Sequence, residues 1–254
     1  MKILLSALLV ATALSGAALA DEKRTYVVAS DGDYPPFDIT LPDGTIAGFS
    51  PDLAKAICAD RKLDCKFVKL EFSGLIPALV AGKIDMVAAL TISEERKKSI
   101  SFSDPTYKSP VYFIGRKDLK VDVNNEADLK KLKIGVEGAS IMECYVDEHL
   151  PDANKSLYKA QVDALQDLKN GRIDILIGEG LQFQEHFLKD NPNYALLGKQ
   201  LESPKCFGPG TGIAIRHEDT ELAKTLNEGL KSVRADGTYK TINQKYIPID
   251  ISPK

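Results

Sequence analysis

The sequence of 254 residues contains no run of basic side chains, and its formal net charge at pH 7 is −3. Proteins that follow a nucleic-acid backbone need a stripe or patch of lysine and arginine to neutralise the phosphates. The composition therefore excludes nucleic acid as an expected partner.

The sequence also lacks the short motifs of several enzyme classes. It has no P-loop, no nucleophile elbow and no dinucleotide-binding fingerprint. The three histidines, His149, His186 and His217, are scattered without the spacing of metal ligands. The glycine-rich segment over residues 208–212 precedes an expected strand rather than a helix, so it indicates a bend. We therefore expect no catalytic residue, no metal and no cofactor.

Long apolar runs are absent after residue 20. Residues 1–20 begin with the charged Lys2, continue with an apolar run over residues 3–14 and end with small residues at 18–20. This order is typical of a secretory signal peptide with cleavage before Asp21. No later stretch reaches the roughly 20 apolar residues that cross a bilayer. We expect a soluble protein that is exported to the periplasm.

Strands and helices alternate in the first part of the remaining chain. Runs of β-forming residues between turn residues predict strands over 25–30, 65–68 and 84–89. Helical patterns lie between these strands, over 50–58 and from residue 72 to about 82. This order predicts an α/β fold with a doubly wound, mainly parallel sheet.

The same alternation begins again near residue 132. It predicts strands and helices over 132–136, 140 onward, 161–170, 173–177, 211–215 and 220–235. Two such units predict two lobes joined by two crossing strands. We assign residues 21–108 and 210–254 to lobe 1, and residues 109–209 to lobe 2.

Four cysteines in an oxidising compartment favour disulfide bonds. Cys58 and Cys65 lie seven residues apart across an expected helix end and turn, which allows a local bridge. Cys144 and Cys206 can pair only if the fold brings them together. We favour this second bridge because both residues fall in the expected lobe 2.

Polar and aromatic residues fall at or just after the carboxyl ends of expected strands, at Tyr34, Thr91, Ser140 and Glu179. Ligands of open α/β sheets bind beyond these ends. The coincidence predicts a single site between the lobes.

The charges at this site suit a free amino acid. The Thr91 hydroxyl can accept a hydrogen bond from an ammonium, and the planar Arg96 guanidinium can bind a carboxylate through two bonds. Ser140 and Ile141 begin a helix with a capping box, and its free N–H groups also favour a carboxylate. Glu179, between two glycines, can meet an ammonium. Each residue also has a plain structural interpretation, as a helix cap, a solvated charge or a loop acid.

Two rings and two acids complete the candidate set. Tyr34 and Phe72 follow expected strands and could enclose a ligand side chain, although the pattern alone favours partial core packing. Asp31 and Asp33 flank a glycine and could neutralise a cationic side chain. The alternative for both aspartates is an Asx turn.

Eight short motifs in combination resemble a known family. They are Asp31…Tyr34-Pro35-Pro36-Phe37, Gly48-Phe49-Ser50-Pro51-Asp52-Leu53-Ala54, Phe72…Leu75-Ile76-Pro77-Ala78-Leu79, Lys83-Ile84-Asp85-Met86, Thr91-Ile92-Ser93-Glu94-Glu95-Arg96, Phe102-Ser103-Asp104-Pro105, Gly171-Arg172-Ile173-Asp174 and Asp236-Gly237-Thr238-Tyr239. From residue 27 to residue 246, the chain resembles the periplasmic polar amino-acid-binding proteins of ABC importers (solute-binding protein family 3). It is most similar to the lysine/arginine/ornithine- and histidine-binding group.

The resemblance implies a monomeric, two-lobed type II periplasmic binding protein that closes on one amino acid and delivers it to an ABC permease in the inner membrane. It implies that Arg96 and the N–H groups at Ser140 and Ile141 bind the α-carboxylate. It also implies further roles in ligand binding: Thr91 and the carbonyl of Ala89 for the α-ammonium, Tyr34 and Phe72 for the side chain, and Asp31 for a distal cation. The spacing of Cys58 and Cys65 resembles the single disulfide of that group.

Three positions depart from the pattern of the group. Glu179 stands where an aspartate usually meets the α-ammonium, Ala88-Ala89 stands where serines or glycine are usual, and Ile141 stands where threonine is common. The longer acid leaves open an arginine-, lysine-, ornithine- or histidine-type ligand and an opine-like derivative.

Two alternative functions share the fold. The periplasmic cyclohexadienyl (arogenate/prephenate) dehydratases are similar, but Gln182 occupies the position of their catalytic glutamate. We therefore expect no enzyme activity. A subunit that presents ligand to a sensor would need the same site, so the sequence does not separate it from a transport subunit.

Overall fold

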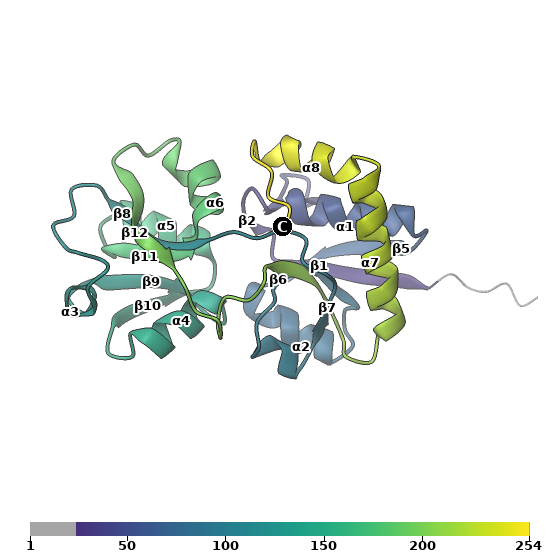
Figure 1. The fold of residues 1–254 in the computed structure, drawn as a ribbon, viewed down its shortest axis with the longest axis horizontal. Coiled ribbons are helices and arrows are strands. Elements are labelled where there is room, and N and C mark those ends of the chain that lie inside the picture. Colours follow the sequence, from purple (N-terminus) through teal and green to yellow (C-terminus); the bar gives the residue numbers. More distant parts are fainter. Residues whose placement is uncertain (1–23, 254) are drawn as a thin grey trace, which may run out of the picture.

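The computed structural model describes residues 24–253, and the predicted signal peptide lies outside this range. The described chain forms two α/β lobes side by side along the longest axis of the molecule (Figure 1). Two segments, residues 103–110 and 202–210, run between the lobes. The carboxyl-terminal end of the chain lies close to this junction.

The first lobe contains a five-stranded sheet in the order β5-β1-β6-β13-β7. Strands β1, β5 and β6 are parallel, whereas β13 is antiparallel to both β6 and β7. The bounds are Thr25–Ser30 (β1), Asp64–Lys69 (β5), Met86–Thr91 (β6), Ser101–Phe102 (β7) and Thr211–Ile215 (β13). A small sheet adds Asp33–Tyr34 (β2), Asp38–Thr40 (β3) and Ile46–Ala47 (β4).

Alternating side chains of this sheet enter two separate cores, as the pleat of a strand requires. Along β6, Met86 and Ala88 face one core and Val87 faces the other. The first core packs against Phe49–Asp60 (α1), Thr220–Ala235 (α7) and Thr238–Tyr246 (α8). The second core packs against Leu75–Val80 (α2), which follows the 3-10 turn Phe72–Gly74.

The second lobe repeats this plan with the order β10-β9-β11-β8-β12. Its strands are Val111–Arg116 (β8), Lys133–Glu137 (β9), Asn154–Tyr158 (β10), Ile175–Glu179 (β11) and Tyr194–Leu201 (β12). Its helices are Glu126–Leu129 (α3), Ile141–His149 (α4), Gln161–Lys169 (α5) and Gly180–Gln182 (α6), the last of which continues into a π-helix at Phe183–Leu188. One core lies beneath α4, and α5 covers the opposite face of the sheet.

In each sheet, three parallel strands lie side by side, and the next strand in the sheet is antiparallel to them and enters from the other lobe. Strand β8 enters the second sheet after residues 103–110, and β13 enters the first sheet after residues 202–210. The crossing segments touch one another, because Thr211 N donates to the Tyr107 carbonyl oxygen at 2.9 Å. This topology places the carboxyl ends of the parallel strands of both sheets at the junction.

Several strand boundaries differ from the sequence prediction. The strands predicted over 84–89 and 173–177 lie two residues later, at Met86–Thr91 and Ile175–Glu179. In both cases a turn glycine, an isoleucine and an aspartate precede the strand, and the aspartate binds a backbone N–H of the neighbouring strand. Asp85 accepts from Val27 N at 2.9 Å and Asp174 accepts from Lys133 N at 2.7 Å.

The structure also adds strands β8, β10 and β12, which the sequence analysis missed. The polar run of β10 carries no clear alternation of apolar and polar residues, and all five residues are at least partly exposed.

Both predicted disulfides are present, Cys58–Cys65 and Cys144–Cys206. No cysteine of residues 24–253 is free. The second bridge joins α4 to the crossing segment of residues 202–210. None of the helices within the described range is both long enough and apolar enough to span a membrane.

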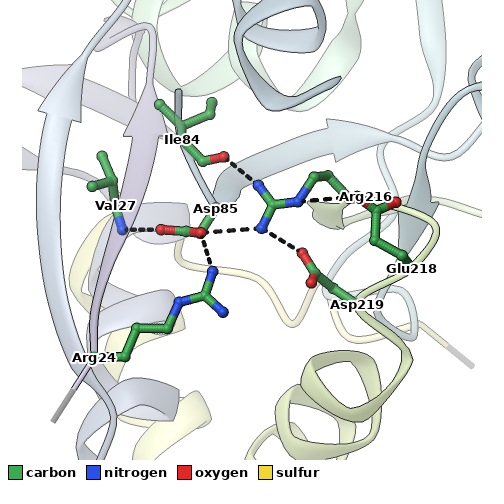
Figure 2. Close-up of polar contacts among 7 residues, drawn as sticks. All are labelled: Arg24, Val27, Ile84, Asp85, Arg216, Glu218 and Asp219. Atoms are coloured by element: carbon green, nitrogen blue, oxygen red, sulfur yellow. Dashed lines mark hydrogen bonds and ion pairs between the residues drawn. The ribbon is translucent and has the colours of Figure 1, made fainter. Parts of the chain in front are cut away.

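A cluster of charges lies at the amino-terminal ends of β1 and β6 (Figure 2). Asp85 receives hydrogen bonds from Arg24 at 2.6 Å and from Arg216 at 3.1 Å. Arg216 also donates to the Ile84 carbonyl oxygen at 2.7 Å and pairs with Asp219 at 2.7 Å. The cluster therefore ties β6 to the start of β1 and to the segment that leads from β13 into α7.

Candidate functional site

A cavity lies between the two lobes, lined by side chains from both. Nine of the ten residues that the sequence analysis considered for ligand binding line it: Asp31, Tyr34, Phe72, Ala89, Thr91, Arg96, Ser140, Ile141 and Glu179. The structure therefore brings together side chains from both halves of the sequence.

Arg96 is held at the centre of the junction by bonds to both lobes. It begins the 3-10 turn after β6, and its side chain is buried. Its Nη1 donates to the Thr91 carbonyl oxygen at 3.0 Å and its Nη2 donates to the Ala139 carbonyl oxygen at 3.3 Å. The Phe72 ring lies 5.7 Å from the guanidinium carbon and covers it. Guanidinium N–H groups that face the cavity suit an anionic ligand group.

Burial lowers the pKa of Arg96 to about 10, against the opposing effect of the nearby Glu137 and Glu179 carboxylates. The guanidinium therefore stays positively charged at neutral pH. It is the one arginine or lysine among the described residues that line the cavity.

The amino-terminal end of α4 faces the same cavity. Ser140 Oγ caps the helix and accepts from Met142 N at 3.1 Å and from Glu143 N at 3.3 Å. The predicted capping box is present with a shift of one residue, because Glu143 accepts from Ala139 N at 2.7 Å rather than from Ser140 N. The first N–H groups of a helix have no partner within the helix, so those at Ser140 and Ile141 can bind an anion beside Arg96.

Glu179 ends β11 and lies opposite Tyr34 of the first lobe. One carboxylate oxygen, Oε2, is buried without a hydrogen-bond partner in the structure, and the Tyr34 hydroxyl is buried in the same condition. Burial raises the pKa of Glu179 to about 8, against the opposing effects of Tyr34 and Arg96. Buried polar atoms without partners are costly, so a polar or cationic ligand group at this position would remove the cost.

Three more acids surround the cavity. Burial raises the pKa of Asp31 to about 6, and the charge of Asp33 adds to this increase. Asp38 accepts a hydrogen bond from Ser30 Oγ, and burial together with the charge of Asp31 raises its pKa well above the usual range. Burial and the charge of Asp31 raise the pKa of Glu137 to about 8. The cavity is thus rich in carboxylates that lack cationic partners.

The structure does not bring Asp33 into the cavity with Asp31. Asp33 instead forms an ion pair of 2.8 Å with Lys69, and both side chains are exposed. The prediction that Asp33 could neutralise a ligand cation is therefore wrong. The side chain belongs to the surface of the first lobe.

Sequence reasoning missed Glu137, Asp38, Tyr107 and Thr211 as lining residues. Glu137 ends strand β9, whereas the predicted strand ended at residue 136. Glu137 was therefore not considered as a polar residue at a strand end, the criterion that selected Glu179. Tyr107 stacks on Phe37 with ring centroids 4.4 Å apart, and it lies on a crossing segment. No short motif marks such a position, because the topology alone brings it to the cavity.

Residues 26–249 match the family model described as bacterial extracellular solute-binding proteins, family 3. The chain is 38% identical to the L-arginine-binding protein of Pseudomonas aeruginosa, over 88% of each protein. Among solved structures, it is similar to a Salmonella typhimurium periplasmic binding protein with high arginine specificity, with a TM-score of 0.80 and 29% identity over 88% of this chain and 99% of that chain.

A sensor domain of a histidine kinase has the same fold, with a TM-score of 0.81 and 26% identity over 92% of this chain and 100% of that domain. The family match covers nearly the whole described chain. This chain belongs to the bacterial extracellular solute-binding proteins of family 3.

Proposed function

We propose that this protein is the extracytoplasmic solute-binding subunit of an ABC transporter and that it captures a basic amino acid, arginine first among them. The observation that carries the proposal is the composition of one interlobe cavity, with a single buried guanidinium and buried acids from both lobes that form no ion pair. The related arginine-binding proteins support the same ligand class.

The α-carboxylate of the ligand binds at Arg96 in this proposal. The planar guanidinium can donate two parallel hydrogen bonds to a carboxylate. The N–H groups at Ser140 and Ile141 complete the anion site from the second lobe, where the positive end of the α4 dipole adds to the attraction. One ligand group therefore contacts both lobes.

The α-ammonium binds between Glu179, the Thr91 hydroxyl and the carbonyl oxygen of Ala89. All three line the cavity, and the free Oε2 atom of Glu179 supplies a charged acceptor. The ligand side chain then lies between Tyr34 and Phe72 and points its cation toward Asp31.

The mechanism is closure of two lobes around the ligand. A ligand shifts the equilibrium between open and closed forms only through contacts that are better in the closed form. The anion site at α4 and the carboxylate of Glu179 belong to the second lobe, so they provide this difference for a ligand first held at Arg96. We propose that lobe 1 comprises residues 21–108 and 210–254, and that lobe 2 comprises residues 109–209. The closed monomer is then recognised by the permease.

An enzyme of the dehydratase type has less support. Gln182 is fully buried, and its side-chain oxygen accepts a hydrogen bond from Gln161 Nε2 at 3.3 Å. An amide held in this way does not act as a general acid at neutral pH. A prephenate turnover assay tests the point directly, and measurable turnover would contradict a pure binding role.

The first experiment measures thermal unfolding of refolded, ligand-stripped protein with the twenty amino acids, ornithine, citrulline, octopine, nopaline and prephenate. A ligand at 100 times its dissociation constant adds about 2.7 kcal/mol to the stability, which raises the unfolding temperature clearly. We expect arginine to give the largest increase, followed by the other basic amino acids. Stabilisation by neutral or acidic amino acids alone would overturn the proposed ligand class.

The transport role is tested separately, with the permease in vesicles and ligand-dependent ATP hydrolysis as the readout. Stimulation by the loaded protein supports transport. Absence of stimulation together with specific capture of a sensor kinase would identify a sensory subunit instead. The histidine kinase sensor domain of the same fold is the reason for this second candidate.

A further inference from the structure

Glu137 is a buried acid that none of the ligand contacts above uses. It ends β9 and lines the cavity with 5% of its surface exposed. Its Oε1 atom accepts a hydrogen bond from Gln161 N at 3.2 Å, at the start of α5. Its backbone carbonyl oxygen accepts from Ser140 Oγ at 2.6 Å. The start of α5 therefore holds the Glu137 carboxylate, and the start of α4 holds its backbone.

The hydrogen bond from the start of α5 holds the Glu137 carboxylate on the side of the cavity near Asp31. Helix α5 packs across the junction against β2, the short strand that follows Asp31 in the first lobe. Among the charged neighbours of Glu137, Asp31 has the largest effect, and its negative charge helps to raise the pKa of Glu137. The two carboxyl groups, one from each lobe, thus face the same region of the cavity.

The groups that face Glu137 leave its charge uncompensated. Asp31 and Glu179 repel it, Gln161 N supplies a neutral hydrogen bond, and the guanidinium of Arg96 provides partial attraction. In the proposed function, Arg96 is neutralised by the ligand carboxylate. A second positive charge, carried by the ligand side chain, is needed at the far end of the cavity.

We propose that Glu137 and Asp31 together bind the distal cation of the ligand, one carboxylate from each lobe, and that Glu137 is a specificity-determining residue of this site. The inference rests on the proposed function and extends it. A guanidinium has five N–H donors in a planar fork, which can serve two carboxylates at once. The site therefore selects side chains that end in a multidentate cation.

The same arrangement rejects two classes of ligand. A neutral side chain such as that of citrulline would leave Glu137 and Asp31 without a positive charge between them. An opine adds a carboxylate to a cavity that already holds four acids against one arginine. Like charges in a buried site are strongly unfavourable, so both ligands bind only if additional protons stay on the acids.

The test compares arginine with citrulline, its neutral analogue of nearly the same shape, by calorimetry and thermal unfolding. The variants are Glu137→Gln, which removes the charge, Glu137→Asp, which keeps it, and Glu126→Gln, an exposed acid of the same lobe as the control. We expect Glu137→Gln to weaken arginine binding about tenfold or more while citrulline changes little, because a hydrogen bond to a charged group is lost only for arginine. Glu137→Asp should keep part of the preference for arginine, and Glu126→Gln should leave both affinities unchanged.

A measurement on the unmodified protein tests the inference even if the variants fold poorly. Arginine is titrated into protein saturated with citrulline, in phosphate and in Tris buffer at the same pH. The arginine complex should hold fewer protons than the citrulline complex, so the exchange should release protons to the buffer, and the measured heat should differ between the two buffers. If citrulline does not bind even at millimolar concentration, the preference for arginine over citrulline has the expected direction. The arginine affinities of the three variants then test the inference.

Distinct results separate this inference from the proposed function. If the unmodified protein binds arginine but Glu137→Gln weakens arginine and citrulline equally, or weakens neither, Glu137 has only a structural role and the inference is overturned. Equal proton content of the two complexes would overturn it as well. Failure of the unmodified protein to bind any amino acid would instead overturn the proposed function.

Discussion

Arg96 of the first lobe donates a hydrogen bond across the junction to the carbonyl oxygen of Ala139, at a distance of 3.3 Å. Ala139 has a positive φ of 59° and immediately precedes the Ser140 cap of α4. The residue proposed to hold the ligand carboxylate is thus in direct contact with the helix start proposed to share it. Binding and closure depend on the same side chain.

Replacement of Arg96 should abolish tight binding. Removing one partner of a buried charge pair costs about 2–5 kcal/mol, so we expect Arg96→Met to weaken arginine binding about 30-fold or more by calorimetry. Arg96→Lys keeps the charge but loses the planar guanidinium. Its affinity for arginine should lie between that of the unmodified protein and that of Arg96→Met. The exposed neighbour Lys97 serves as the control, and Lys97→Met should bind normally. Normal binding by Arg96→Met would place the carboxylate elsewhere.

Glu179→Ala should weaken binding about tenfold or more even though Arg96 remains intact, because the ligand ammonium loses its charged acceptor. The affinity for desamino-arginine, which lacks the α-amino group, should hardly change between this variant and the unmodified protein. Competition calorimetry with arginine and its desamino analogue measures both. If arginine binds Glu179→Ala with full affinity, Glu179 is a buried acid outside the ligand site.

An exposed ion pair bridges the two lobes outside the cavity, between Lys159 and Glu71 at 3.2 Å. Both side chains are mostly exposed, at 84% and 53%, so water and salt screen their attraction. We expect Lys159→Met to reduce arginine affinity less than about fivefold, and the reduction to vanish in 1 M salt. A large effect that survives high salt would show that this pair, rather than the cavity, controls closure.

The two disulfides should contribute unequally to stability. Cys144–Cys206 closes a loop of 62 residues, whereas Cys58–Cys65 closes a loop of only seven. In the chain-entropy model, the loss of the longer loop costs about 4 kcal/mol and the loss of the shorter one roughly 2–3 kcal/mol. Urea unfolding of the two double alanine variants measures the difference. Equal destabilisation would show that loop length does not govern their effects here.

Asp85 should stabilise the protein above its ordinary pKa and lose this effect in acid. Burial alone would raise the pKa of Asp85, but the hydrogen bonds from Val27, Arg216 and Arg24 outweigh it and lower the pKa below the usual value. A carboxyl whose pKa falls on folding adds stability that is present above its unfolded pKa and is lost as the pH falls through the folded pKa. Asp85→Asn should therefore be destabilising at pH 7 and nearly neutral at pH 2, as measured by urea unfolding.

Asp118 provides the comparison for this pH dependence, because it pairs with Arg116 at the exposed surface. Asp118→Asn should change the unfolding free energy little at either pH, since exposed ion pairs contribute little. Equal destabilisation of Asp85→Asn at both pH values would mean that packing, and not charge, explains its role (Figure 2).

Much of the fold could be predicted from local patterns. The strand Thr211–Ile215 and the helix Thr220–Ala235 were predicted with their observed bounds, because the strand is a short, fully buried run and the helix has a clear amphipathic period. The two-lobe plan followed from the repeated order of strands and helices. Strands such as β10, which lie at a sheet edge and carry polar side chains, gave no such pattern and depend on tertiary pairing with β9.

The candidate site was predictable where it follows strand ends and motifs, and not where it depends on topology. Asp31 and Glu179 lie beside glycines at such ends, and both line the cavity. Tyr107 reaches the cavity only because a crossing segment passes it. Glu137 was missed because the predicted strand ended one residue too early. An error of one residue at a strand end is thus enough to hide a charged side chain.

The Cys144–Cys206 bridge limits where the molecule can bend. It fixes Cys206 to α4, while Thr211 is already paired with Thr91 in the first sheet. Between these two fixed points lie residues 207–210, of which Phe207 stacks on Tyr145 and Gly210 accepts a hydrogen bond from Ile92 N. Two of these four are glycines, and a side chain at Gly208 would lie 1.7 Å from the Ile92 carbonyl oxygen. Separation of the two halves therefore has to change torsion angles within this short stretch and within the other crossing segment, residues 103–110.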